Sequence, residues 1–259
     1  MPTNPIYSKE PSEFWQGESL ALAKAIRKNN VDSLKFVVQK YAIDLNKPGN
    51  GGMTFLLWSC SHRHLEATRA LLELGADPNQ NIVVGKQVND TYQLVSLLAE
   101  GDQYDLLNLV LDHGGDPNSL HGSQPALHCA IDNDKDRDSG KFDNMLLLID
   151  KGADINRVDH SGYTPVMYAA SANQYIAVEI LLNKGATITN VGRLGLTLPH
   201  IVEMRLEELK DQPTHTYYLQ ILQVKRMLEQ RGVKFPLPSF TVDPKTGIRQ
   251  YAPIIINKK

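Results

Sequence analysis

The chain has 259 residues but only two cysteines, Cys60 and Cys129. Two cysteines cannot form the disulfide framework of a small secreted domain, and both lie in apolar segments, so we expect them to be small buried side chains. No apolar run approaches the ~18 residues that a membrane-spanning helix requires. The opening residues carry neither the basic nor the apolar region of a signal peptide. The sequence as it stands therefore favours a cytoplasmic protein, with a periplasmic or lipid-anchored protein as the alternative if an export signal has been removed.

The chain also has little net charge, with 27 Lys and Arg residues against 29 Asp and Glu residues. Nucleic-acid binding depends on clustered basic residues, so we expect no nucleic-acid partner. The sequence lacks Gly-x-Ser-x-Gly, P-loop, dinucleotide-binding and His-Glu-x-x-His motifs. Two histidines in Ser61-His62-Arg63-His64 are two positions apart and do not share a helix face, which disfavours zinc. We therefore expect no enzymatic activity and no cofactor.

One acidic segment has the spacing of a calcium loop. The first, third, fifth and twelfth places of an EF-hand-like loop fall on Asp132, Asp134, Asp136 and Asp143. However, the sixth place, where glycine makes the sharp turn, is Arg137, and the twelfth place lacks the longer glutamate. We favour a solvated charged loop, and a calcium-responsive regulator stays as an alternative.

What the chain does have is a recurring five-residue phrase. It reads Gly-Ala-Asp-Pro-Asn or a close variant, begins at Gly75, Gly114, Gly152 and Gly185, and each time follows an apolar helical run. Glycine after a helical leucine pair suits the left-handed residue that ends many helices, and Asp or Asn suits the following turn. The glycines are 33 to 39 residues apart. A period of this length indicates a repeat protein whose helical pairs stack.

A second recurring element begins the first helix of each repeat. In Gly162–Ala170, threonine can cap a helix whose first residue is proline, and paired alanines allow close packing. With the glycine phrase, this pattern resembles the ankyrin repeat; Gly52–Trp58 and Pro125–Ala130 keep part of it, and Gly195–His200 displaces the proline by one position. The resemblance covers roughly residues 17–235 and implies an all-α solenoid of about six helix-turn-helix units.

The expected organisation has three parts: an extended leader over residues 1–16, an ankyrin-repeat domain over residues 17–235 and a C-terminal tail over residues 236–259. Apolar spacing predicts helices over residues 18–28 and 32–41, and over 199–210 and 216–231 in the sixth unit. In the tail, Phe240–Val242 and Ile248–Tyr251 flank a five-residue turn, which predicts a hairpin. Longer connections occur at residues 81–90 and 132–143, and such insertions often lie on a binding face.

The ankyrin resemblance also implies a binding groove, formed by the turn tips and the exposed positions of the first helices. It implies a folded protein partner and a chain that is monomeric when free. The corresponding positions are Asn50, Met53, Ser61, His62, Asn89, Tyr92, Glu100, His121, Gln124, Asp132, His160, Tyr163, Ser171 and Leu196, with Trp58 and Arg63 close by. Tyrosine, tryptophan, methionine and arginine often anchor interfaces. The expected partner-binding set is therefore Asn50, Met53, Trp58, His62, Arg63, Tyr92, Gln124, His160 and Tyr163.

Met53, Tyr92 and Tyr163 share one tip position in three units and are the preferred anchors, whereas Trp58 falls at a place that also suits a core residue.

Residues 11–17 followed by 20–26 look like the opening of bacterial ankyrin proteins encoded beside secreted antibacterial toxins. Several such proteins act as immunity proteins, often as exported periplasmic lipoproteins. That resemblance implies occlusion of a toxin or effector enzyme, such as one delivered by type VI secretion, with a general adaptor or host-directed effector as the alternative.

Overall fold

The computed structural model describes residues 9–83, 91–132, 142–193, 195–238, 241–242 and 249–251. These residues form two compact units, both built mainly of helical pairs. The first unit comprises the described chain up to Asp132 together with Asp143–Ala153, and the second comprises chiefly the described residues from Asp154 onward. None of the helices within these ranges is long and apolar enough to cross a bilayer.

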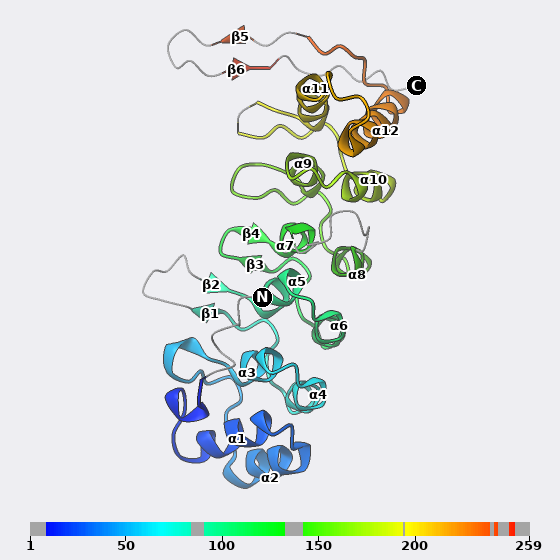
Figure 1. Ribbon diagram of the computed structural model, residues 1–259. Coiled ribbons are helices and arrows are strands. Elements are labelled where there is room, and N and C mark those ends of the chain that lie inside the picture. Colours follow the sequence, from blue (N-terminus) through cyan, green and yellow to red (C-terminus); the bar gives the residue numbers. More distant parts are fainter. Residues whose placement is uncertain are drawn as a thin grey trace. The chain divides into compact units, whose positions relative to one another are not determined.

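The first unit begins with a short 3-10 helix, η1 (Pro11–Glu13), followed by successive pairs of packed helices. The pairs are α1 (Gly17–Arg27) with α2 (Val31–Tyr41), α3 (Phe55–Ser61) with α4 (Leu65–Glu73), α5 (Leu94–Glu100) with α6 (Tyr104–Asp112), and α7 (Ala126–Asp132) with α8 (Asp143–Asp150) (Figure 1). Neighbouring pairs stack: α1 packs on α3 and α5 on α7, while α2, α4, α6 and α8 pack in order. The helices predicted over residues 18–28 and 32–41 each begin one residue earlier than expected.

Short fingers connect the pairs of the first unit, and Figure 1 shows them on one side of the helices. They comprise the 3-10 turn η2 (Asn50–Gly52) and the strands β1 (Ile82–Val83), β2 (Thr91–Tyr92), β3 (Leu120–His121) and β4 (Gln124–Pro125). The strands form an antiparallel sheet in the order β1-β2-β3-β4, in which Tyr92 is paired with His121. The helical solenoid class is therefore confirmed, with two-residue strands within the fingers.

The second unit contains two helical pairs among its described residues, followed by a hairpin. The elements are α9 (Pro165–Ser171), α10 (Tyr175–Asn183), α11 (Leu198–Glu208), α12 (Thr216–Gln230), β5 (Thr241–Val242) and β6 (Arg249–Gln250). Helix α9 packs on α11 and α10 on α12. The antiparallel pairing of β5 with β6 confirms the predicted hairpin, whose turn at residues 243–248 lies outside the described residues.

The recurring threonine stands at the N-cap position of α3, α9 and α11, but Thr164 before α9 makes no side-chain capping hydrogen bond. Thr54 Oγ1 accepts a hydrogen bond from the Leu57 amide at 3.0 Å, and Thr197 begins α11 in a mutual cap with His200. Helix α11 therefore starts in the usual place although its proline is displaced. The glycine of each recurring phrase has a φ of 87° to 94°, a conformation that side chains with a Cβ atom rarely adopt.

Asparagines at the ends of the recurring phrases join neighbouring repeats. The Asn79 amide donates to the Gly114 carbonyl at 2.8 Å, and its Oδ1 accepts from the Asp116 N–H at 2.7 Å. Asn46 makes the same two bonds to Gly75 and Asp77. We call this arrangement the asparagine bridge. It satisfies backbone groups of the turn that follows each helix, and it links each turn to the next.

The leader differs from the expected extended segment. Residues 11–13 form η1, and the Trp15 ring stacks on Phe55 with 4.9 Å between centroids. Trp15 is only 5% exposed, and a Cβ atom at Gly49 would lie 2.6 Å from its Nε1 atom. The hydrophobic core of the first helical pairs therefore includes Trp15. The proline and polar residues around it do not predict this burial.

Replacing Asn79 tests the asparagine bridge. We expect Asn79→Ala to lower the free energy of unfolding by about 1–3 kcal/mol, because two hydrogen bonds of about 0.5–1.5 kcal/mol each are lost. Urea denaturation followed by circular dichroism measures the change. Asn183→Ala at the exposed end of α10 is the control and should change stability by less than ~0.5 kcal/mol. Equal midpoints for the two variants would show that the bridge contributes nothing.

Candidate protein-binding surface

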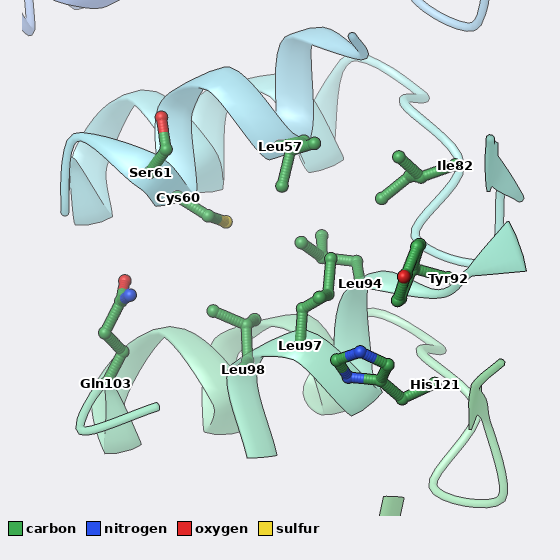
Figure 2. Close-up of a pocket in the computed structure, with 10 residues that line it drawn as sticks. All are labelled: Leu57, Cys60, Ser61, Ile82, Tyr92, Leu94, Leu97, Leu98, Gln103 and His121. Atoms are coloured by element: carbon green, nitrogen blue, oxygen red, sulfur yellow. The ribbon is translucent and has the colours of Figure 1, made fainter. Parts of the chain in front are cut away.

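A pocket of about 360 Å³ lies between α3 and α5 in the first unit, beside the fingers. Figure 2 shows side chains of the two helices facing one another across it, with finger residues closing one end. The lining consists of Leu57, Cys60, Ser61, Ile82, Tyr92, Leu94, Leu97, Leu98, Gln103 and His121. The second helices behind this region, α4 and α6, pack directly on one another. At this point of the stack the second helices of the two pairs, α4 and α6, are in contact, whereas the first helices, α3 and α5, leave a pocket between them.

The lining is mainly apolar. Ile82, Leu94 and Leu98 are each at most 3% exposed and form the deeper wall. Leu57 on α3 and Leu97 on α5 are only half-buried, because they face the open space rather than another helix. Two partly exposed leucines facing each other on neighbouring helices leave apolar surface that a ligand or partner can cover.

Polar groups line the finger end of the pocket. The Tyr92 ring meets the His121 ring edge-on at 4.4 Å between centroids, because the two residues are paired across β2 and β3. His121 Nδ1 lies 3.0 Å from Glu100 Oε2 at the end of α5. Strand pairing thus places an aromatic ring and an imidazole at one rim of an apolar pocket, and Glu100 from α5 brings a carboxylate to the imidazole.

The pocket lacks an activated nucleophile. Burial raises the pKa of the Cys60 thiol to about 12, although a hydrogen bond with the Thr68 hydroxyl opposes the shift. Burial likewise raises the pKa of Cys129 to about 12, with smaller contributions from Glu100 and Asp132. Thiols with such pKa values stay protonated at neutral pH and are poor nucleophiles and metal ligands. The expectation that both cysteines are buried core residues is confirmed.

The described part of the chain contains no cluster of three or more His, Cys, Asp or Glu residues that could hold a metal ion. Of the calcium-loop candidates, Asp132 ends α7 and Asp143 begins α8. Asp134 and Asp136 lie outside the described residues.

Three of the expected partner-binding residues of the first unit lie on its fingers, namely Asn50, Tyr92 and Gln124, whereas His62 and Arg63 follow the end of α3. Tyr92 lines the pocket, and His62 is half-buried with its ring 4.3 Å from that of Trp58. Burial lowers the pKa of His62, so the ring is neutral at pH 7. Further contacts are an ion pair of Arg63 with Asp102, a bond from Gln124 to Asp132 at 3.4 Å, and a bond from Asn50 to the Glu13 carbonyl at 3.3 Å.

Trp58 and Met53 do not present a surface. Trp58 is 0% exposed, and its Nε1 donates to the Ala23 carbonyl at 3.1 Å. Met53 is 6% exposed. The centroids of the Phe14 and Trp15 rings each lie 5.6 Å from the centroid of the Trp58 ring, so aromatic side chains of the leader pack against it. We therefore place both residues in the core.

His160 and Tyr163 belong to the second unit. His160 is exposed, whereas Tyr163 is half-buried against the next turn, where a Cβ atom on Gly192 would lie 2.6 Å from its ring. Burial raises the pKa of the Tyr163 hydroxyl, and the negative charge of Asp159 raises it further. The tip position shared by Met53, Tyr92 and Tyr163 therefore has three different environments.

Sequence reasoning missed Leu57, Leu97 and the pocket between them. A signal was present, since Leu57 stands where the ankyrin motif has histidine, and Leu97 falls between the serine and leucine of an otherwise apolar helix. The sequence does not show that α3 and α5 stand apart, so it does not distinguish these leucines from ordinary helix-packing residues.

Comparison with known proteins agrees with this architecture. Residues 8–82 and 94–191 match the family model described as ankyrin repeats (3 copies). Protein PhlB of Serratia liquefaciens is 28% identical over 173 residues, which cover 64% of this chain and 68% of PhlB. The human mitochondrial disaggregase is 27% identical over 241 residues, and the chain spans 30% of its length.

Solved structures show the same fold at low sequence identity. The ankyrin-repeat domain of Bcl-3 has a TM-score of 0.62 at 21% identity, covering 81% of this chain and 85% of that domain. A chain in the complex of the predatory endopeptidase Bd0816 from Bdellovibrio bacteriovorus with the immunity protein Bd3460 has a TM-score of 0.58 at 19% identity. The match covers 78% of this chain and 97% of that chain.

The buried cysteines give a test of the site's packing. At pH 8 we expect native Cys60 and Cys129 to react with iodoacetamide at least ~100-fold more slowly than in urea, because a pKa near 12 leaves almost no thiolate. Mass spectrometry of tryptic peptides measures both rates. A cysteine placed at exposed Ser123 (Ser123→Cys) is the reactive control. Native Cys60 reacting as fast as this control would mean that α3 does not bury it.

Proposed function

Because the chain belongs to the ankyrin-repeat family, whose repeats are protein-binding modules, we propose that it is a non-catalytic protein that inhibits a secreted toxin or effector enzyme by covering it. The proposed contact surface is the finger face of the first unit. We define this face as the pocket between α3 and α5 together with His62, Arg63, Tyr92, His121 and Gln124.

The observation that carries the proposal is the open apolar pocket beside the fingers. Protein interfaces centre on apolar and aromatic side chains that become fully desolvated, surrounded by a polar rim. Leu57 and Leu97 supply half-exposed apolar surface, and Tyr92 and His121 form the adjoining rim. A monomer gains nothing from leaving such surface open, so it favours a partner.

The partner class rests on two further likenesses. The opening over residues 11–26 resembles bacterial ankyrin proteins encoded beside secreted toxins, and one similar chain comes from the complex of an endopeptidase with an immunity protein. A preformed surface loses little conformational entropy on binding, so occlusion of an active site needs no chemistry in the inhibitor. Asn50 and, in the second unit, His160 and Tyr163 are proposed as additional contacts.

Inhibition of a neighbouring enzyme tests the partner class. We expect the purified chain to abolish the activity of a toxin-type enzyme encoded beside its gene at a molar ratio of about one, because each molecule covers one active site. The measurement is enzyme activity against increasing amounts of the chain. An unrelated ankyrin-repeat protein is the control. Full enzyme activity at a tenfold excess of the chain would contradict the proposal.

Truncating Tyr92 tests the surface. If Tyr92 anchors the partner, Tyr92→Ala should weaken binding about 30-fold, which corresponds to a hot-spot loss of about 2 kcal/mol. Tyr104→Ala is the matched control, since Tyr104 is 45% exposed at the start of α6, away from the pocket lining. Isothermal titration calorimetry measures both affinities. Equal losses for the two variants would remove the finger face from the interface.

A further inference from the structure

We infer that the pocket between α3 and α5 receives one large apolar side chain of the partner, and that a basic residue lies next to that side chain in the partner. The inference rests on the proposed function, because it assigns the chemistry of the partner segment at the finger face. It adds to the proposed function by stating that the partner residue beside the pocket carries a positive charge.

The size of the pocket limits its occupant. A volume of about 360 Å³ is near the lower end of the ~300–1,000 Å³ found for small-ligand sites. The Ser61 hydroxyl already donates to the Trp58 carbonyl at 2.8 Å, and the adjoining wall is leucine, isoleucine and a protonated thiol. Such a lining suits the body of one aromatic or long aliphatic side chain rather than a nucleotide or sugar.

The Glu100 side chain brings negative charge to the pocket lining, because it reaches the finger residue His121. Glu100 and Asp132 are the last residues of α5 and α7, two helices that pack together. Glu100 Oε2 lies 3.0 Å from His121, which lines the pocket. Both carboxylates also contribute to the raised pKa of Cys129, so their fields overlap.

Arg63 follows α3 and forms an ion pair with Asp102, two residues beyond Glu100, so its charge already has an acidic partner. A cation entering beside Tyr92 and His121 therefore meets carboxylates, whereas an anion is repelled. Electrostatic complementarity of this kind fixes the orientation of a segment and excludes anionic competitors such as fatty acids.

Two small probes with one apolar body and opposite charges test the inference. We would titrate 4-phenylbutylamine and 4-phenylbutyrate into the full chain carrying ¹³C-labelled Ile, Leu and Val methyl groups. The methyl signals of Ile82, Leu57 and Leu97 should shift with the amine. At low salt the amine should bind about 3- to 10-fold more tightly than the carboxylate, and the ratio should fall towards one in about 0.5 M salt.

Two variants separate the apolar and the charged contributions. Glu100→Gln should reduce the preference for the amine, whereas Glu66→Gln on α4 should not. Leu97→Trp should fill the pocket and abolish binding of both probes, whereas Leu219→Trp at an exposed site on α12 should leave binding intact. The methyl spectrum of each variant reports whether it is folded. Should Leu97→Trp be unfolded, Leu57→Gln provides a second pocket variant.

The outcomes are distinct. Absence of binding by either probe, equal binding of both, or tighter binding of the carboxylate would each overturn the inference. The titration uses the chain alone, so it does not depend on which enzyme is the partner. Failure to inhibit a toxin with intact amine selectivity would reject the proposed function and leave the pocket chemistry standing.

Discussion

The asparagine bridge is the contact on which the spacing of the repeats depends. A helical pair buries its apolar face only against its neighbours, so each turn must sit at a fixed distance from the next. Asn79 sets this distance with two bonds, of 2.8 Å and 2.7 Å, to the backbone of the following turn. In the second unit the Thr187 N–H donates to Asn156 Oδ1 at 2.9 Å in the same way. The bonds connect backbone to side chain, so they tolerate wide variation in the apolar residues behind them.

This constraint explains how a pocket can form inside a stack. The turns and the second helices α4 and α6 keep the pairs together, so the first helices α3 and α5 can stand apart without separating the repeats. Ile82 and Tyr92, from strands on either side of the longer connection, close the finger end of the gap. The pocket is therefore a local departure from regular stacking, and its walls are held by contacts that lie outside it.

The sequence was sufficient for elements that depend on local chemistry. The glycine caps and the C-terminal hairpin were predicted because each follows from residues close together in the chain. The pocket and the burial of Trp58 were not, because they depend on residues far apart: Trp58 is covered by Phe14 and Trp15, about forty positions earlier. Tyr92 was predicted as a tip residue, but its partner His121 became evident only from strand pairing.

The pocket alone cannot account for tight binding, and this shapes what a partner must look like. Full burial of a leucine is worth about 1.5–3 kcal/mol, and Leu57 and Leu97 are already half-buried, so covering them yields only a few kcal/mol. A nanomolar complex requires about 12 kcal/mol. Neighbouring polar side chains add little, since Ser61 and Arg63 already have partners within the chain. The remaining affinity must come from a broad contact over the fingers, with the pocket and its carboxylates fixing the register.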